Sequence, residues 1–230
     1  MDWREDAKKR AALEAVKHVR EGFVVGLGSG TTVAYAIQEI GKRIKREGLQ
    51  VLGVPTSHQA LMLAVNHSIP ITTLDEHPKL DLTIDGADQI DRDLNLIKGM
   101  GGALMREKIV ASAAKQFVIV ADKTKLVEKL GTSQPIPLEV LPFALSTVIA
   151  RIKELGGKPV LREGNRKIGP VVTDNGNFIL DVEFESVDAL DKLDVALKLI
   201  PGVLETGLFM SMADVVYLGK SDGVMRLERK

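Results

Sequence analysis

The chain has 230 residues, 45% of them hydrophobic, which is enough for one sizeable α/β domain or for one domain with a smaller companion. Lys plus Arg and Asp plus Glu number 31 each, and this balance argues against a binding surface for nucleic acid or an anionic membrane. The absence of cysteine excludes disulfides, thiolate catalysis and cysteine-ligated metal centres, and it favours a reducing cytoplasm. The four histidines show no paired ligand spacing, so no metal site is expected.

The amino-terminal residues predict a helix rather than a targeting segment. Apolar residues follow a helical period between Asp2 and Arg20, and the segment lacks the apolar core and flanks of a signal peptide. No apolar run approaches the length that is needed to span a membrane. We therefore expect a cytoplasmic protein whose partners are neither nucleic acid nor a membrane.

Strands and helices alternate through the first 130 residues. The apolar runs that predict strands are residues 23–27, 51–54, 71–74, 80–84 and 117–121. The segments with a helical period are residues 33–47, 60–65 and 103–115. This alternation is typical of an α/β fold with an open, mostly parallel, Rossmann-like sheet flanked by helices.

The order of elements changes after a run of helix and strand breakers at residues 131–137, which indicates a domain boundary. Beyond it we predict the strands 138–141 and 178–184, strands near Val160 and Val171, and the helices 144–155 and 187–199. The strand-like runs 208–210 and 215–218 are expected to return the chain to the first sheet. The sequence thus predicts a catalytic domain of residues 1–130 and 206–230, and a smaller α+β insertion of residues 131–205 that serves as a lid or for oligomerisation.

A glycine-rich turn, Gly26 to Thr32, lies between a predicted strand and a predicted helix. Backbone N–H groups and the positive end of the helix dipole favour phosphate binding there, and the hydroxyls of Ser29, Thr31 and Thr32 add donors. The turn is neither a P-loop nor a dinucleotide fingerprint, which would need glycine in place of Thr31. The alternative is a tight turn in which Thr31 or Thr32 only caps the helix.

Two carboxylates follow the predicted strand 80–84. Asp85 and Asp88 lie just beyond its end, where ligands bind in open α/β sheets, and Gly86 and Ala87 between them leave room. Carboxylates that face a pocket of low dielectric serve as acids, bases or hydroxyl acceptors. The pattern of an EF-hand calcium loop is absent. An ordinary turn with solvated carboxylates is the alternative.

A lysine, a glycine-rich loop and a glutamate form the next group. Lys98 precedes Gly99, Gly101 and Gly102, and glycines let the backbone approach a ligand closely. Glu107 follows about one turn into the next predicted helix. A solvated helix residue is the alternative for Glu107.

Lysines in two further segments are candidates for binding an anion. Lys123 and Lys125 follow the predicted strand 117–121 and would lie at the same edge of the sheet as the groups above. Lys8 and Lys9 lie near the amino terminus. A lone lysine in a loop is usually solvated, but one crevice at the carboxyl ends of parallel strands would bring these groups together.

In their order along the chain, these segments resemble ribose-5-phosphate isomerase of type A. The segments that carry the resemblance are residues 26–32, 85–88, 98–108, 121–125, 171–177 and 201–209, and they cover almost the whole chain. The resemblance implies interconversion of ribose 5-phosphate and ribulose 5-phosphate through a cis-enediolate. It also implies that the enzyme needs no cofactor and forms a homodimer or homotetramer.

Carried over residue by residue, the resemblance implies that Glu107 is the general base. It assigns Asp85, Asp88 and Lys98 to the sugar hydroxyls and the oxyanion. It assigns phosphate binding to Lys8, Ser29, Gly30, Thr31, Thr32 and Lys125. The remaining residues of the expected substrate site are Gly86, Ala87, Gly99, Gly101 and Gly102.

The sequence departs from the family pattern at Met100 and Met105, where a change could alter the pocket wall, although the sequence does not tell its effect. It also departs at Ser29, which keeps the hydroxyl of a more frequent threonine. An aminosugar-phosphate deaminase, a sugar-phosphate lactonase and the sugar-sensing domain of a transcription repressor resemble this sheet as well. Lys98 and Glu107 in one loop favour isomerisation over the first two. The residues before Phe23 are too few for the helix-turn-helix that a repressor needs.

Overall fold

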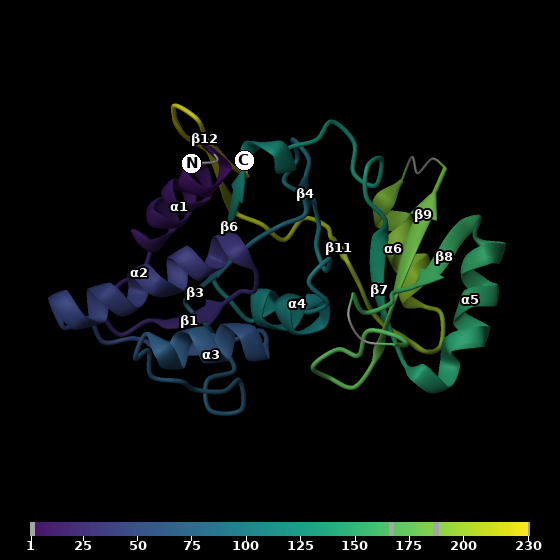
Figure 1. The fold of residues 1–230 in the computed structure, drawn as a ribbon, viewed down its shortest axis with the longest axis horizontal. Coiled ribbons are helices and arrows are strands. Elements are labelled where there is room, and N and C mark those ends of the chain that lie inside the picture. Colours follow the sequence, from purple (N-terminus) through teal and green to yellow (C-terminus); the bar gives the residue numbers. More distant parts are fainter. Residues whose placement is uncertain (1–2, 166–167, 186–188, 230) are drawn as a thin grey trace.

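The computed structural model describes residues 3–165, 168–185 and 189–229. A six-stranded sheet with its helices forms one part of the molecule, and a four-stranded sheet with two helices lies beside it (Figure 1). Between them, a small three-stranded sheet and helix α4 (Leu104–Ser112) join the two parts. Among the described residues, no helix is long and apolar enough to cross a bilayer.

The central sheet has six strands in the order β13-β12-β6-β3-β1-β2. Five of them run parallel, and β13 is antiparallel to its neighbour β12. The bounds are β1 (Val24–Leu27), β2 (Leu52–Pro55), β3 (Leu82–Asp85), β6 (Phe117–Asp122), β12 (Val215–Lys220) and β13 (Gly223–Glu228). Every residue of β1, β3 and β6 is buried, as in a parallel sheet that is covered on both faces. The predicted open, mostly parallel sheet with flanking helices is confirmed.

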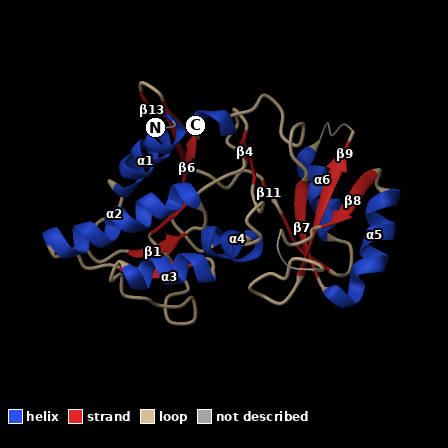
Figure 2. Cartoon of the chain, viewed as in Figure 1, coloured by secondary structure: helices blue, strands red, loops and turns tan. Residues whose placement is uncertain are grey.

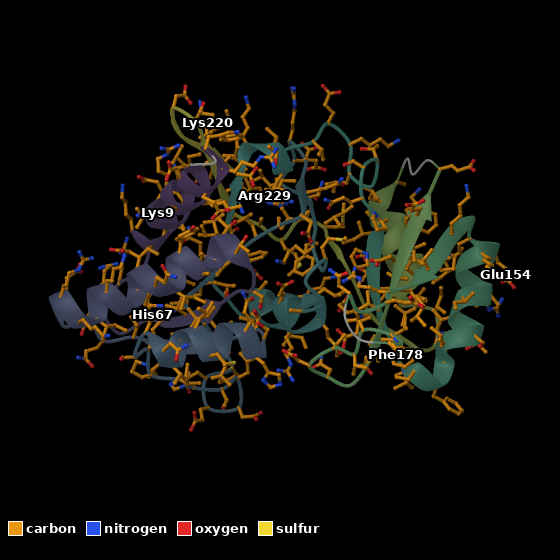
Figure 3. The ribbon with its side chains drawn as sticks, in the orientation of Figure 1. Lys9, His67, Glu154, Phe178, Lys220 and Arg229 are labelled. Atoms are coloured by element: carbon orange, nitrogen blue, oxygen red, sulfur yellow. The ribbon has the colours of Figure 1, made fainter. Side chains whose placement is uncertain are left out.

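Helices α1 (Trp3–Val16) and α2 (Thr31–Glu47) cover one face of this sheet. The side of α1 that meets the sheet is made of small residues, namely Ala7, Ala11, Ala12 and Ala15, all fully buried. Because these side chains are small, the helix lies close to β12, and a Cβ added to Gly219 would be 2.0 Å from the carbonyl oxygen of Ala7. Figure 3 shows Lys220 at the tip of the β12–β13 hairpin, where Arg10 of α1 donates to its carbonyl oxygen.

The opposite face is covered by α4 and by the three-stranded sheet β11-β5-β4. The strands of this small sheet are β4 (Gln89–Ile90), β5 (Leu96–Ile97) and β11 (Leu208–Phe209), and their pairings are antiparallel. Helix α3 (His58–Asn66) follows β2 and packs on α2. The predicted end of the second helix is confirmed, because Gly48 adopts a left-handed conformation with φ of 71° and caps α2 through Ile44.

The companion sheet, β10-β7-β9-β8, is antiparallel (Figure 2). Its strands are β7 (Ile136–Val140), β8 (Gly157–Leu161), β9 (Phe178–Phe184) and β10 (Val203–Thr206). Helices α5 (Leu145–Glu154) and α6 (Leu190–Lys198) complete a separate apolar core with it. Two 3-10 turns, η1 (Lys123–Lys125) and η2 (Pro142–Ala144), lie before β7 and before α5. The division of the chain into two domains stays a prediction.

Three predicted strands are wrong or belong to another sheet in the structure. Residues 71–74 form only an isolated bridge at Ile71, because the Thr72 hydroxyl bonds to Glu76 and His77 and turns the chain. The region of Val171 forms only isolated bridges, since the chain reverses between Thr173 and Asn177. Residues 208–209 join the small sheet instead of the first sheet, whereas 215–220 do return to it.

The sequence did not predict the strands β4, β5, β10 and β13. Asp2 and Val187, the first residues of two predicted helices, lie outside the described residues. The helices themselves begin at Trp3 and Leu190 as described.

Candidate active site

A cavity of about 470 Å³ opens where the parallel strands β1, β2, β3 and β6 end. Ligands bind in this place in open α/β sheets, because the turns that follow neighbouring strands converge there. Fourteen of the residues that the sequence assigns to the site line it. They are Lys8, Ser29, Gly30, Thr31, Thr32, Gly86, Ala87, Asp88, Lys98, Gly99, Gly101, Gly102, Glu107 and Lys125.

A buried lysine between two buried carboxylates forms the floor of the site. The ammonium nitrogen of Lys98 lies 3.1 Å from Oδ2 of Asp85 and 3.3 Å from Oε2 of Glu107. Only 2% of Lys98, 0% of Asp85 and 5% of Glu107 is exposed. Lys98 also donates to the Gly86 carbonyl at 2.6 Å. These contacts fix the ammonium group at one point between the turn after β3 and the helix α4.

Burial determines how this cluster binds protons. Burial, followed by the negative charge of Asp85, raises the pKa of Glu107 to about 8 against the opposing charge of Lys98. Burial also raises the pKa of Asp85. For Lys98, burial acts to lower the pKa, but the charges of Asp85, Glu107 and Asp88 outweigh it and raise the pKa above its usual range. The lysine therefore stays charged, and Glu107 is poised to exchange a proton near neutral pH.

Of the residues that the resemblance assigns to the site, Asp85 does not line the cavity, and neither do the further candidate lysines Lys9 and Lys123. Oδ1 of Asp85 accepts hydrogen bonds from the backbone N–H of Ser29 at 3.1 Å and of Gly86 at 2.7 Å. A Cβ at Gly28 would lie 2.2 Å from the same oxygen, so glycine is required for this approach. Asp85 thus links the turn after β1 to the turn after β3 without reaching the cavity. Of the two carboxylates, Asp88 is the one that faces the cavity.

The amino terminus of α2 faces the cavity without a side-chain cap. Its N-cap is Gly30, with φ of 111°, a conformation that favours glycine. The proposed alternative, in which Thr31 or Thr32 caps this helix, is wrong, because no side-chain cap bond is present. Exposed N–H groups at a helix amino terminus bind anions. Lys8 and Lys125 line the same cavity and add positive charge.

Several lining residues escaped the sequence analysis. Ser57 and Gln59 belong to the start of α3, where the Ser57 hydroxyl bonds to that of Ser29 and the Gln59 Oε1 accepts from Gly30 N at 2.9 Å. The signal for them was the polar segment 56–59 directly after an apolar strand. The others are Arg4, Val33, Ala103, Ala121, Asp122, Thr124 and residues 171–174.

The two methionines that depart from the family pattern do not line the cavity. The backbone N–H of Met100 donates to Oδ2 of Asp88 at 3.0 Å, so this residue holds Asp88 through its main chain. The sequence left the effect of Met100 and Met105 on the pocket open, and neither residue is among those that line the cavity. Within residues 3–165, 168–185 and 189–229, no group of three or more His, Asp or Glu side chains has the arrangement of a metal site.

Comparison with known proteins agrees with this geometry. The family model described as ribose 5-phosphate isomerase A (phosphoriboisomerase A) matches residues 52–223. The chain belongs to the ribose 5-phosphate isomerase A family. The ribose-5-phosphate isomerase A of Methanosarcina acetivorans is 50% identical over 220 residues, which are 96% of this chain and 93% of the relative.

Solved structures of ribose-5-phosphate isomerases have the same fold. The enzyme of Methanocaldococcus jannaschii is 48% identical, with a TM-score of 0.94 over 97% of this chain and 99% of that one. A D-ribose-5-phosphate isomerase in complex with phospho-erythronic acid is 45% identical, with a TM-score of 0.95 over 98% and 99% of the two chains. The chain therefore matches these isomerases over almost its whole length.

Proposed function

We propose that this member of the family interconverts D-ribose 5-phosphate and D-ribulose 5-phosphate through a cis-enediolate, with Glu107 as the base. The observation that supports the proposal most directly is the buried cluster of Lys98, Asp85 and Glu107 beside an uncapped helix terminus. The exchange of an aldose and a ketose needs one carboxylate that moves a proton and positive charge near the developing oxyanion. Glu107 and Lys98 supply both within 3.3 Å of each other.

In this proposal Glu107 removes the proton from C2 and returns it to C1. Its pKa of about 8 lets it take the proton and give it back near neutral pH. The ammonium group of Lys98 stabilises negative charge on the substrate oxygen, because it is held in a site with little water. Asp88, which lines the cavity, accepts a hydroxyl proton during ring opening.

The substrate phosphate binds at the start of α2 in this proposal. Ser29, Gly30, Thr31 and Thr32 form that end of the cavity, and Lys8 and Lys125 add positive charge. The backbone of Gly86, Ala87, Gly99, Gly101 and Gly102 lines the part that receives the sugar. Binding energy from the phosphate orients the carbons that react.

A coupled assay of ribose 5-phosphate conversion by the purified chain tests the activity. Free ribose serves as the matched control, and we expect its kcat/KM to be at least about 1000-fold lower because the phosphate supplies remote binding energy. Equal efficiency for the two sugars would refute the phosphate assignment. An absence of turnover of ribose 5-phosphate would refute the proposed function.

Isotope transfer tests the enediolate. In deuterated water, product should acquire deuterium at C1, because the proton on Glu107 exchanges with solvent before it is returned. Complete intramolecular transfer of a C2 deuterium, without any label from solvent, would indicate a hydride shift instead.

We also propose a cytoplasmic location and a homodimer or homotetramer, with a small sugar phosphate as the binding partner. The absence of cysteine and the balanced charge support the location. Light scattering of the purified protein would test the oligomer: a monomer at the concentration of the assay would contradict it.

A further inference from the structure

The segment 171–177 brings the companion sheet to the cavity. It connects the region of β8 to β9, and yet Val171, Val172, Thr173 and Asp174 line the cavity. The proposed mechanism gives these residues no role. Figure 1 shows this segment as a green loop that extends from the companion sheet toward the central part of the molecule.

One buried carboxylate holds this segment. Glu139 in β7 is fully buried, and its Oε1 accepts from Thr173 Oγ1 at 2.9 Å, Asn175 Nδ2 at 2.9 Å and Asn177 Nδ2 at 2.8 Å. The Thr173 hydroxyl in turn accepts from the N–H groups of Asn175 and Asn177. The other carboxylate oxygen, Oε2, has no hydrogen-bond partner in the described chain. Among the residues that the structure describes, every hydrogen bond of the Glu139 side chain therefore goes to this one segment.

The same segment anchors a helix on the phosphate side of the cavity. Oδ2 of Asp174 accepts from the N–H of His58 at 2.8 Å, and His58 is the first residue of α3. The neighbours of His58, Ser57 and Gln59, line the cavity and bond to the turn that carries Ser29 and Gly30.

It also anchors the helix that carries the base. Arg106 donates from Nε to Oδ1 of Asn175 at 2.7 Å and from Nη2 to the carbonyl oxygen of Asp174 at 2.8 Å. Arg106 directly precedes Glu107 in α4. The Asn175 amide thus connects two residues at once, since it donates to Glu139 and accepts from Arg106.

We propose that Glu139 is a positioning residue of the isomerase, which fixes the segment 171–177 so that Asp174 places α3 and Arg106 places Glu107. This inference rests on the proposed function. A side chain that positions a base and a binding group changes kinetic parameters beyond any change in folding stability, because displacement by about 1 Å lowers a rate by up to about 100-fold.

The substitutions Glu139→Ala and Glu139→Gln test the proposal as a pair. Glutamine keeps a carbonyl oxygen where Oε1 lies, so it preserves the acceptor of all three hydrogen bonds. We expect Glu139→Ala to lower kcat/KM for ribose 5-phosphate by about 10- to 100-fold, and Glu139→Gln to stay within about threefold of the wild type. Glu183→Ala, at an exposed position of β9 in the same sheet, is the control and should keep wild-type kinetics.

Two variants at the outer contacts keep the test valid if Glu139→Ala does not fold. Arg106→Met removes the contacts to α4, so kcat should fall while KM changes little. Asp174→Ala removes the contact to α3, so KM should rise while kcat changes little. Binding of phospho-erythronic acid, measured by calorimetry, should weaken in Asp174→Ala and remain near the wild-type value in Arg106→Met.

The outcomes separate this inference from the function on which it rests. Wild-type kinetics in both Arg106→Met and Asp174→Ala would refute the positioning role even if Glu139→Ala lost stability. A Glu139→Ala protein that is folded and fully active would refute it as well. If the wild-type chain itself did not convert ribose 5-phosphate, the proposed function would fail, and the inference would fail with it.

Discussion

The ammonium group of Lys98 contacts two buried carboxyl groups, those of Asp85 and Glu107. One positive charge for two carboxyl groups determines how the cluster binds protons. With one ammonium group for Asp85 and Glu107, full ionisation would leave an excess negative charge in a site of low dielectric. Oδ1 of Asp85 accepts from two backbone N–H groups, and among the described residues neither Oδ2 of Asp85 nor Oε2 of Glu107 has a hydrogen bond. Burial raises the pKa of both carboxyl groups, and Glu107, which lines the cavity, is the one placed to exchange a proton with a substrate.

Replacement of Glu107 by glutamine tests its role as the base. The substitution keeps the size of the side chain but removes the proton acceptor, so we expect kcat to fall by about 100- to 10,000-fold, the usual contribution of a positioned base. Steady-state kinetics with ribose 5-phosphate would measure the fall, and circular dichroism would show that the fold is retained. Turnover near the wild-type level would remove Glu107 from this role.

The same substitution should increase stability at alkaline pH. The pKa of Glu107 rises from its ordinary 4.5 to about 8 on folding, so between these values the folded state binds more protons than the unfolded state. Stability then falls as the pH rises through this window, and the loss is complete above about pH 8. Glu107→Gln lacks this loss, so its melting temperature should exceed that of the wild type at pH 9 by more than it does at pH 5. An equal difference at the two pH values would contradict the raised pKa.

At the scale of residues, the sequence predicted which side chains come together but not which of them face the ligand. Spacing after apolar strands indicated Asp85 and Asp88 equally, and only the structure separates them, because Gly28 brings the backbone of the first turn directly onto Asp85. Glu139 gave no signal, since a lone glutamate in an apolar strand acquires its partners from a segment 34 to 38 residues later in the chain.

At the scale of elements, the contact of α1 with β12 depends on the absence of side-chain atoms. Ala7 and Gly219 meet at the backbone, and no rotamer can relieve the clash of an added Cβ there because the contacted atoms belong to the main chain. This close contact also holds α1 where Lys8 reaches the cavity.

Gly219→Val should therefore displace α1 and lower stability. Overpacking of a close contact costs about 1–3 kcal/mol, and the shift of Lys8 should also raise KM for ribose 5-phosphate. Urea unfolding and steady-state kinetics would measure the two effects. Asp222→Ala, in the exposed turn of the same hairpin, is the matched control. Wild-type stability in Gly219→Val would contradict the close packing of the helix.

Elements with a clear apolar run or period were predictable, and elements without one were not. The helices α2 and α5 show a helical period of apolar residues, and β6 is one continuous apolar run. The unpredicted strands β4 and β5 have two residues each, so pairing with distant segments defines them rather than a local pattern. Residues 71–74 have the composition of a strand, but the side-chain bonds of Thr72 turn the chain there.

At the scale of the whole molecule, the central sheet is interrupted in sequence by the companion sheet. β6 ends at Asp122, its neighbour β12 begins at Val215, and the four strands of the companion sheet lie between them in the chain. The chain therefore passes between the two parts twice, near residues 130 and 207. The segment 171–177 adds a further connection, made by hydrogen bonds to His58 and Arg106.

Removal of the last hairpin should prevent the central part from folding. A chain that ends after Asp214 lacks β12 and β13, which exposes the edge of β6 and the apolar side of α1. We expect amides of α1 to exchange as in an unfolded peptide in this truncated chain, whereas amides of β7 and β9 keep protection because their core is separate. Hydrogen exchange measured by mass spectrometry would test both expectations, and protection of α1 in the truncated chain would contradict the first.

This arrangement has a consequence for synthesis on the ribosome. Helix α1 emerges first, but the strand against which its alanines pack is made about 200 residues later. During translation the apolar side of the helix therefore stays exposed until β12 is synthesised. The companion sheet is able to fold earlier, because its last strand is complete once Thr206 has been added. Formation of the substrate cavity, which includes Lys8 of α1, is therefore a late event that follows release of the hairpin from the exit tunnel.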